Sequence, residues 1–211
     1  LECSVDDLEK FRKNHLAEKL WMTDETISDG SWCYTEDLRI KPAMDHLHIL
    51  IDIVSKNGVL LLNVSPRADG TIPQDQQQVL LEMGQWLERY GEAIYGTRPW
   101  YTFGEGPTGE PERQNPGAYQ QISYTSEDVR YTTSASDVYA LFLGKPRQES
   151  EVLLKAFAAD SLDGDLRVKA VTLAGGGEAL QWEQEDQGLR IQMPARGLNP
   201  LSTVVKIETI N

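Results

Sequence analysis

The spacing of apolar residues predicts helices in the first half of the chain and short strands in the second. Two stretches of the first half repeat apolar positions every three or four residues, which places them on one helix face. We expect Pro42 to lie in the first turn of the first helix and Gly58 to end that helix. Its apolar positions are Met44, Leu47, Leu50, Ile51 and Val54. The second helix is predicted over residues 74–90, and its inner face carries Val79, Leu80, Met83, Trp86 and Leu87.

A continuous apolar run, Val59 to Val64, separates the two helices. Such a run is typical of a strand buried on both faces, as in a parallel sheet. The closing part of a β/α barrel would show this order of elements: a helix, a parallel strand, a loop (residues 65–73) and a second helix. Upstream, Leu8 and Phe11 predict a short amphipathic helix, and residues 23–38 predict a loop.

The composition changes near residue 103, where a polar segment rich in turn-forming residues indicates a domain linker reaching to residue 116. Beyond it, β-branched and aromatic runs alternate with turn residues at hairpin spacing. Strands are predicted over residues 120–124, 129–133, 138–143, 152–157, 166–173, 180–183, 189–193 and 203–207. We therefore expect an α/β plus all-β chain: residues 1–103 as the C-terminal part of a (β/α) barrel, and residues 104–211 as an antiparallel β-sandwich.

Charge and composition exclude several classes of partner and cofactor. The formal net charge of −13 over 211 residues argues against binding to nucleic acid or to an anionic membrane surface. We expect Cys3 and Cys33 to be free thiols packed as small apolar groups, because their spacing fits neither a metal site nor a disulfide framework. His46 and His48 lie two apart on a helix and cannot share a metal ion. Neither the cysteines nor the histidines therefore show the spacing of a metal site.

A succession of motifs is more specific than the composition. It begins with Asp29-Gly-Ser-Trp-Cys-Tyr-Thr-Glu36 and continues through Lys56-Asn-Gly-Val-Leu-Leu-Leu-Asn-Val-Ser-Pro66 and Asp69-Gly-Thr-Ile-Pro73 to Gly91-Glu-Ala-Ile-Tyr-Gly-Thr-Arg-Pro-Trp100. This succession resembles the family 29 glycoside hydrolases, the retaining α-L-fucosidases. The resemblance implies an exo-acting enzyme on fucosylated glycans, without a cofactor, that is secreted, periplasmic or lysosomal. It also implies a catalytic barrel followed by a β-sandwich.

The resemblance also suggests which residues form the site. Retaining hydrolysis needs two carboxyl groups about 5–5.5 Å apart. Many relatives carry a Trp-Glu pair about ten residues before the Ser-Trp element, and this chain has Trp21-Met22 there. Glu25 is therefore the acid/base candidate, with Asp24 as the other nearby substitute. The alternative is that Asp24, Glu25 and Asp29 are all loop acids that hydrogen-bond to turns.

Trp32 and Tyr34 are the substrate-binding candidates, because an aromatic ring can pack on the apolar face of a sugar. The alternative is that Trp32 is a core residue. Asn63, near the end of the predicted strand, is expected to hold the loop of residues 65–73; the alternative is that it contacts the substrate.

The family's nucleophilic aspartate lies on an earlier barrel strand, which we do not find before residue 29. We therefore expect this chain to be inactive alone and either to need a missing N-terminal barrel half or to self-associate through exposed apolar surface. Two alternatives remain: a carbohydrate-binding or structural β-sandwich module without catalysis, and an enzyme of another specificity on the same scaffold.

Overall fold

The first half of the chain forms a small parallel sheet covered by two helices. The computed structural model describes residues 5–109, 122–135, 137–158 and 166–210. Strands β1 (Asp6–Asp7), β2 (Trp21–Thr26) and β3 (Gly58–Asn63) pair in that order, and both pairings are parallel. Helices α1 (Ala43–Ser55) and α2 (Gln74–Tyr90) follow β2 and β3. The two helices lie where the apolar spacing predicts them.

The second half forms two antiparallel sheets, as predicted. Six strands pair in the order β4 (Arg98–Glu105), β5 (Val129–Ser134), β6 (Asp137–Phe142), β12 (Thr203–Ile210), β8 (Arg167–Leu173) and β9 (Glu178–Ala179). Three more pair in the order β10 (Gln181–Glu185), β11 (Gly188–Gln192) and β7 (Glu151–Leu154). Short 3₁₀ helices, η1 (Gly91–Ala93) and η2 (Lys155–Phe157), follow α2 and β7. A core that includes Tyr131, Phe142 and Phe157 lies between the sheets.

Three local predictions in the first half are wrong. No helix forms around Leu8 and Phe11, because the backbone N–H groups of Leu8 and Lys10 donate to Met22 and Asp24 of β2 (both 2.9 Å), not to carbonyls within a helix. Two strands, β1 and β2, precede residue 29, and β2 occupies part of the predicted loop. The first helix ends at Ser55, Asn57 takes the left-handed conformation (φ 67°), and Gly58 begins β3.

Strand β3 is not buried on both faces, which corrects the prediction from its apolar run. Val59 and Leu61 are 44% and 55% exposed, whereas Leu60 and Leu62 pack toward the buried clusters on the helix side. Among the described residues, β3 pairs on one edge only, with β2. The strand therefore has an apolar face and an edge that the described part of the chain leaves uncovered.

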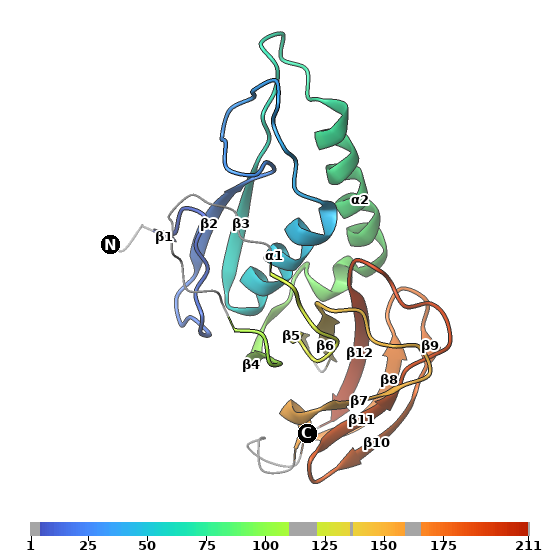
Figure 1. Cartoon of the computed structure of the whole chain (residues 1–211). Helices are drawn as coiled ribbons and strands as arrows, with labels where there is room; N and C mark the ends of the chain where they lie inside the picture. The colour runs from blue at the N-terminus through green and yellow to red at the C-terminus, as the bar shows by residue number, and fades with distance from the viewer. Residues whose placement is uncertain (1–4, 110–121, 136, 159–165, 211) are drawn as a thin grey trace.

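The helices join the two halves of the molecule. In Figure 1, α1 and α2 lie between the parallel strands and the six-stranded sheet, and the loops after β2 and β3 lie side by side at the opposite end. Leu47, Ile51 and Trp86 of the helices share one buried cluster with Leu141 and Val204 of that sheet. The predicted domain boundary at residues 103 and 104 falls within β4, which pairs with β5.

The predicted strand at residues 120–124 lies partly outside the described residues, and residues 122–124 form no strand. None of the helices in the described ranges has the length and apolar character that a membrane crossing needs.

Candidate active site at the carboxyl ends of two parallel strands

The carboxyl ends of β2 and β3 hold the loop that carries both aromatic candidates. Thr26 and Ser28 donate hydrogen bonds to the carbonyl oxygen of Ser31 (2.9 Å from Thr26 Oγ1). Asn63 Nδ2 and Ser65 Oγ donate to the next carbonyl, that of Trp32, at 3.0 and 3.1 Å. Four side chains thus fix two consecutive carbonyls. Asn63 holds this loop and not the loop of residues 65–73, which corrects our expectation.

Trp32 is half-buried on the loop and faces the segment after β1. Its indole Nε1 donates to Glu9 Oε1 at 3.1 Å, and Lys10 Nζ lies 4.6 Å from the ring centroid. Its surroundings are therefore polar and charged, unlike those of a core tryptophan such as Trp21, which is fully buried and donates to the Lys56 carbonyl.

Tyr34, two residues after Trp32, has different neighbours. The Arg67 guanidinium, from the loop after β3, lies 5.6 Å from the centroid of the Tyr34 ring. Tyr34 also lines a surface pocket of about 540 Å³ between this loop and the first turn of α2. The loop therefore presents two half-buried rings to two different surroundings. Cys33, between them, is an exposed free thiol. It is not packed as a small apolar group, so that prediction is wrong.

Glu25 points to the helix side of the sheet. Its residue is only 9% exposed, and its Oε1 accepts hydrogen bonds from the backbone N–H of Thr26 (2.8 Å) and pairs with Lys41 Nζ (2.9 Å). Burial lowers the pKa of Lys41, and the Glu25 carboxylate only partly offsets this. This acid therefore lies under the start of α1, in a buried ion pair.

Asp24 lies on the opposite face of β2, because adjacent strand residues alternate in direction. It pairs in register with the exposed Leu61, whereas Glu25 pairs with Leu62. Burial raises the pKa of Asp24, and the neighbouring carboxylates of Asp7 and Glu9 add to the effect. Asp24 Oδ1 is buried and has no hydrogen-bond partner among the described residues. Since Glu9 also binds Trp32, Asp24 lies on the same side of the site as that ring.

The two histidines of α1 are held by backbone carbonyls. His46 Nε2 lies 3.1 Å from the Ile27 carbonyl oxygen, and His48 Nε2 lies 2.7 Å from that of Leu201. Burial, assisted by the charge of Lys41, lowers the pKa of His46 to about 4. His, Cys, Asp and Glu side chains form no group of three that could hold a metal ion in the described part of the chain.

Comparison with known proteins identifies the family. Residues 3–92 match the family model described as alpha-L-fucosidase, and residues 120–208 match the model described as alpha-L-fucosidase C-terminal domain. The chain is 30% identical over 190 residues to the tissue alpha-L-fucosidase of Rattus norvegicus and 31% identical over 192 residues to that of Homo sapiens. These alignments cover 88% of this chain but only 36% and 35% of the two relatives.

Solved structures show the same fold. The Thermotoga maritima alpha-fucosidase, in complex with a mechanism-based inhibitor, superposes with a TM-score of 0.72 at 26% identity, over 96% of this chain and 42% of that one. Alpha-L-fucosidase isoenzyme 1 from Paenibacillus thiaminolyticus has a TM-score of 0.73 over 97% of this chain and 45% of its own. At 24% identity, that second likeness concerns the fold alone.

The two family models match consecutive parts of the chain, and both describe one class of enzyme, the glycoside hydrolases that act on fucosides. The chain belongs to the α-L-fucosidase family, glycoside hydrolase family 29, as its motifs predict. It spans about a third of the length of the curated relatives that it matches (35–36%).

Proposed function

We propose that this chain is the C-terminal part of a retaining exo-α-L-fucosidase that removes terminal α-L-fucose from glycans. The observation that carries the proposal is the match of both halves, in order, to the two parts of this one enzyme family. Trp32 supports it, because its indole donates to Glu9, beside Lys10, at the carboxyl ends of parallel strands, where barrel enzymes bind substrate. The proposed enzyme uses no metal or organic cofactor.

We propose further that the first half, predicted as residues 1–103, is the last part of the catalytic barrel and that the second half, predicted as residues 104–211, is the C-terminal sandwich, whose first strand, β4, already begins at Arg98. The unpaired edge of β3 and the exposed side chains of Val59 and Leu61 support this, because barrel closure would cover both. The nucleophile would lie on the strands that complete the barrel. This chain alone would then be inactive, since the covalent route has no attacking carboxylate.

Two adjacent residues of β2 are candidates for the acid/base role. Glu25 is the residue that the sequence favours, and it faces the helices in an ion pair with Lys41. Asp24 faces the other side of the sheet, with its pKa raised mainly by burial, as a general acid requires. Trp32 and Tyr34 would contact the sugars. The retaining mechanism does not depend on which acid donates the proton.

The anomer of fucose that is released first tests the proposed retaining mechanism. A protein extended upstream to full barrel length is mixed with an aryl α-L-fucoside, and proton NMR follows the anomeric signals. We expect α-L-fucose to form first, because double displacement retains configuration. Initial formation of the β anomer would exclude the retaining mechanism.

The acid/base assignment is tested in the same extended protein with Asp24→Asn and Glu25→Gln. The substitution that removes the general acid should lower kcat by about 10²–10⁴-fold for a poor leaving group. It should lower kcat much less for a good leaving group, which needs no protonation. A merely structural role would lower both rates equally.

A further inference from the structure

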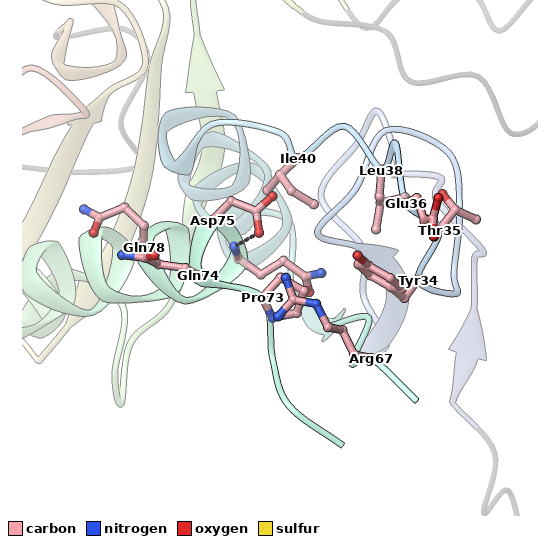
Figure 2. Close-up of a pocket in the computed structure, with 11 residues that line it drawn as sticks. Tyr34, Thr35, Glu36, Leu38, Ile40, Arg67, Pro73, Gln74, Asp75 and Gln78 are labelled. Carbon is pink, nitrogen blue, oxygen red and sulfur yellow. Dashed lines mark hydrogen bonds between the residues drawn. The ribbon is translucent and has the colours of Figure 1, made fainter. Parts of the chain in front are cut away.

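The pocket beside Tyr34 lies apart from the surroundings of Trp32, because neither Trp32 nor its partner Glu9 lines it. It opens between the loop after β2 and the amino-terminal turn of α2, and Figure 2 shows Tyr34 and Arg67 pointing toward one another across it. Leu38 and Ile40 contribute apolar surface from the same loop as Tyr34. Polar side chains complete the lining: Glu36, Gln74, Asp75 and Gln78. Its volume of about 540 Å³ lies in the range of small-molecule sites.

Hydrogen bonds fix the walls of the pocket before any ligand binds. Gln76, which is 1% exposed, accepts from the Ser65 backbone N–H (2.8 Å) and donates to the Ser65 carbonyl (2.9 Å). The turn that carries Arg67 is closed by its own N–H, which donates to the Thr71 carbonyl at 2.8 Å. Asp69 Oδ1 accepts from both the N–H and the hydroxyl of Thr71 (3.0 and 2.7 Å). A site ordered in advance loses less free energy on binding.

The chemistry of the lining favours a neutral ligand rich in hydroxyl groups. The lining holds one cation, Arg67, and two carboxylates, Glu36 and Asp75. An anionic ligand would gain one favourable charge and meet two unfavourable ones, whereas hydroxyl groups can donate to the carboxylates and accept from the guanidinium. The Tyr34 ring offers an apolar plane for the C–H face of a sugar ring.

We propose that this pocket binds a neutral sugar of the glycan that carries the fucose, so that Tyr34 and Arg67 select the remainder of the substrate. The inference rests on the proposed function, because it takes the fucose site to lie on the Trp32 side of the loop. Tyr34 lies only two residues from Trp32 and faces the other way. One glycan could therefore place its fucose against Trp32 and an inner sugar against Tyr34.

The test uses the 211-residue chain and N-acetyllactosamine, a neutral disaccharide without fucose. We expect saturable shifts of the Arg67 Nε–H and of the Gln74 and Gln78 side-chain amides in ¹H–¹⁵N spectra. Tyr34→Ala and Arg67→Ala should each weaken binding about tenfold or more, the effect of losing about 1.4 kcal/mol. Tyr95→Ala is the matched control, because Tyr95 is 66% exposed and lies outside the pocket.

Three results would overturn the proposal: no saturable shifts in the unsubstituted chain, shifts confined to residues elsewhere, or tighter binding of a sialylated form of the disaccharide. The unsubstituted chain decides the first two even if a variant fails to fold. The test is independent of turnover. Disaccharide binding by a protein that never cleaves fucosides would leave the pocket assignment standing, and turnover without binding would remove the pocket assignment alone.

Discussion

At the scale of single residues, the site depends on side chains that hold main-chain carbonyls of the loop between Ser31 and Tyr34. Asn63 is central among them, because its amide joins Thr26 Oγ1 (3.3 Å) of β2 to the Trp32 carbonyl. We expect Asn63→Leu, which keeps the approximate size, to lower the free energy of unfolding by about 1–3 kcal/mol, because it removes two part-buried hydrogen bonds worth about 0.5–1.5 kcal/mol each. It should also broaden the Trp32 indole N–H resonance.

Ser150→Ala is the matched control for that change. The Ser150 hydroxyl also donates to a carbonyl, that of Arg147 at 2.8 Å, but it lies on an exposed turn of the sandwich. Denaturant unfolding and ¹H–¹⁵N spectra compare the two variants. Equal stability of Asn63→Leu and the unsubstituted chain, with a sharp Trp32 signal, would show that the loop does not depend on this amide.

His46 gives a prediction about pH. Its pKa is about 4 in the folded chain, because burial and then Lys41 disfavour the charged ring, while that of an unfolded histidine is about 6.5. The unfolded chain therefore binds the proton more tightly, and the stabilising contribution is complete above about pH 6.5 and is lost as pH falls toward 4. The loss approaches about 3 kcal/mol.

Carbon-bound ring protons of His46, followed by NMR from pH 7 to 3.5, check this value. Glu25, Asp45 and Lys41 are the charged groups around the ring that influence it. His15→Gln, at an exposed position, serves to assign the signals and should leave the titration of His46 unchanged. A midpoint near 6.5 would contradict a buried, neutral ring.

Residue roles could be predicted from the sequence only where they do not depend on which face of a strand a side chain occupies. Trp32 and Tyr34 lie on a loop, as their Gly-Ser lead-in indicates, and both are half-buried. The contrast between Asp24 and Glu25 could not be predicted, because it arises only once Trp21–Thr26 forms a strand in register with β3. Because residues 23–38 were predicted as a loop, the alternation of side chains between the two faces of a strand was not expected there.

At the scale of elements, Gly58 lets β3 lie close to β2 and α1. A Cβ atom there would approach Trp21 Cε2 and Ile53 Cγ2 to 2.6 and 2.7 Å, and both of those side chains are fully buried. We expect Gly58→Ala to destabilise the chain by about 1–3 kcal/mol through overpacking. Gly84→Ala, on the exposed side of α2 with nothing within 4 Å, should instead stabilise it by about 0.5–1 kcal/mol.

Thermal or denaturant unfolding of the two glycine variants tests this contrast in sign. A neutral Gly58→Ala would mean that the Trp21 ring can move, and that the packing of β3 on α1 is looser than the contacts indicate. A Gly84→Ala variant that is destabilised would contradict an exposed position in a regular helix.

Elements were predicted best where the periodic pattern is long. Residues 74–90 form α2 as expected, because seventeen residues of helical spacing leave little ambiguity. The apolar run Val59–Val64 forms a strand, but one face of that strand is exposed. An apolar run shows which residues favour burial; it does not show whether the segment that covers them lies in the same chain. The small strand β1 could not be predicted, because its pairing with β2 is long-range.

At the scale of the whole molecule, one buried carboxylate joins the helices to the large sheet. Asp52 of α1 is fully buried and pairs with Arg130 of β5 (2.6 Å), Lys56 (2.8 Å) and Arg12 (3.4 Å). Burial alone would raise the pKa of Asp52, but Arg12, Arg130 and Lys56 outweigh it and hold that pKa well below its usual range. This junction could not be predicted from the sequence, because its members are up to 118 residues apart (130 − 12).

We expect Asp52→Asn to lower the free energy of unfolding by about 3–5 kcal/mol, because it leaves buried cations without their counter-charge. In the unsubstituted chain, the folded pKa is lower than the unfolded value of about 3.9. The stabilisation from Asp52 is therefore present above about pH 4 and is lost as pH falls below it. The variant should lack this acid-dependent part. Asp37→Asn, at an exposed carboxylate, is the control.

The uncovered face of β3 predicts self-association of the isolated chain. Val59 and Leu61 are exposed beside an unpaired strand edge in the described structure, a combination that favours association. Replacing both by threonine, a polar β-branched residue that suits a strand, should lower the apparent mass in light scattering. Leu81→Gln, at an exposed position of α2, should leave it unchanged. A sharp monomer peak from the unsubstituted chain would contradict this prediction.

The measurement that tests the central claim most directly is turnover of a chromogenic aryl α-L-fucoside by this 211-residue chain beside a version extended upstream to full barrel length. Our account predicts hydrolysis by the extended protein and none by the short chain, because we propose that the nucleophile lies on the strands that would complete the barrel. Hydrolysis by the short chain alone, lost on substitution of Asp24, Glu25 or Asp29, would place the nucleophile within it and contradict the account.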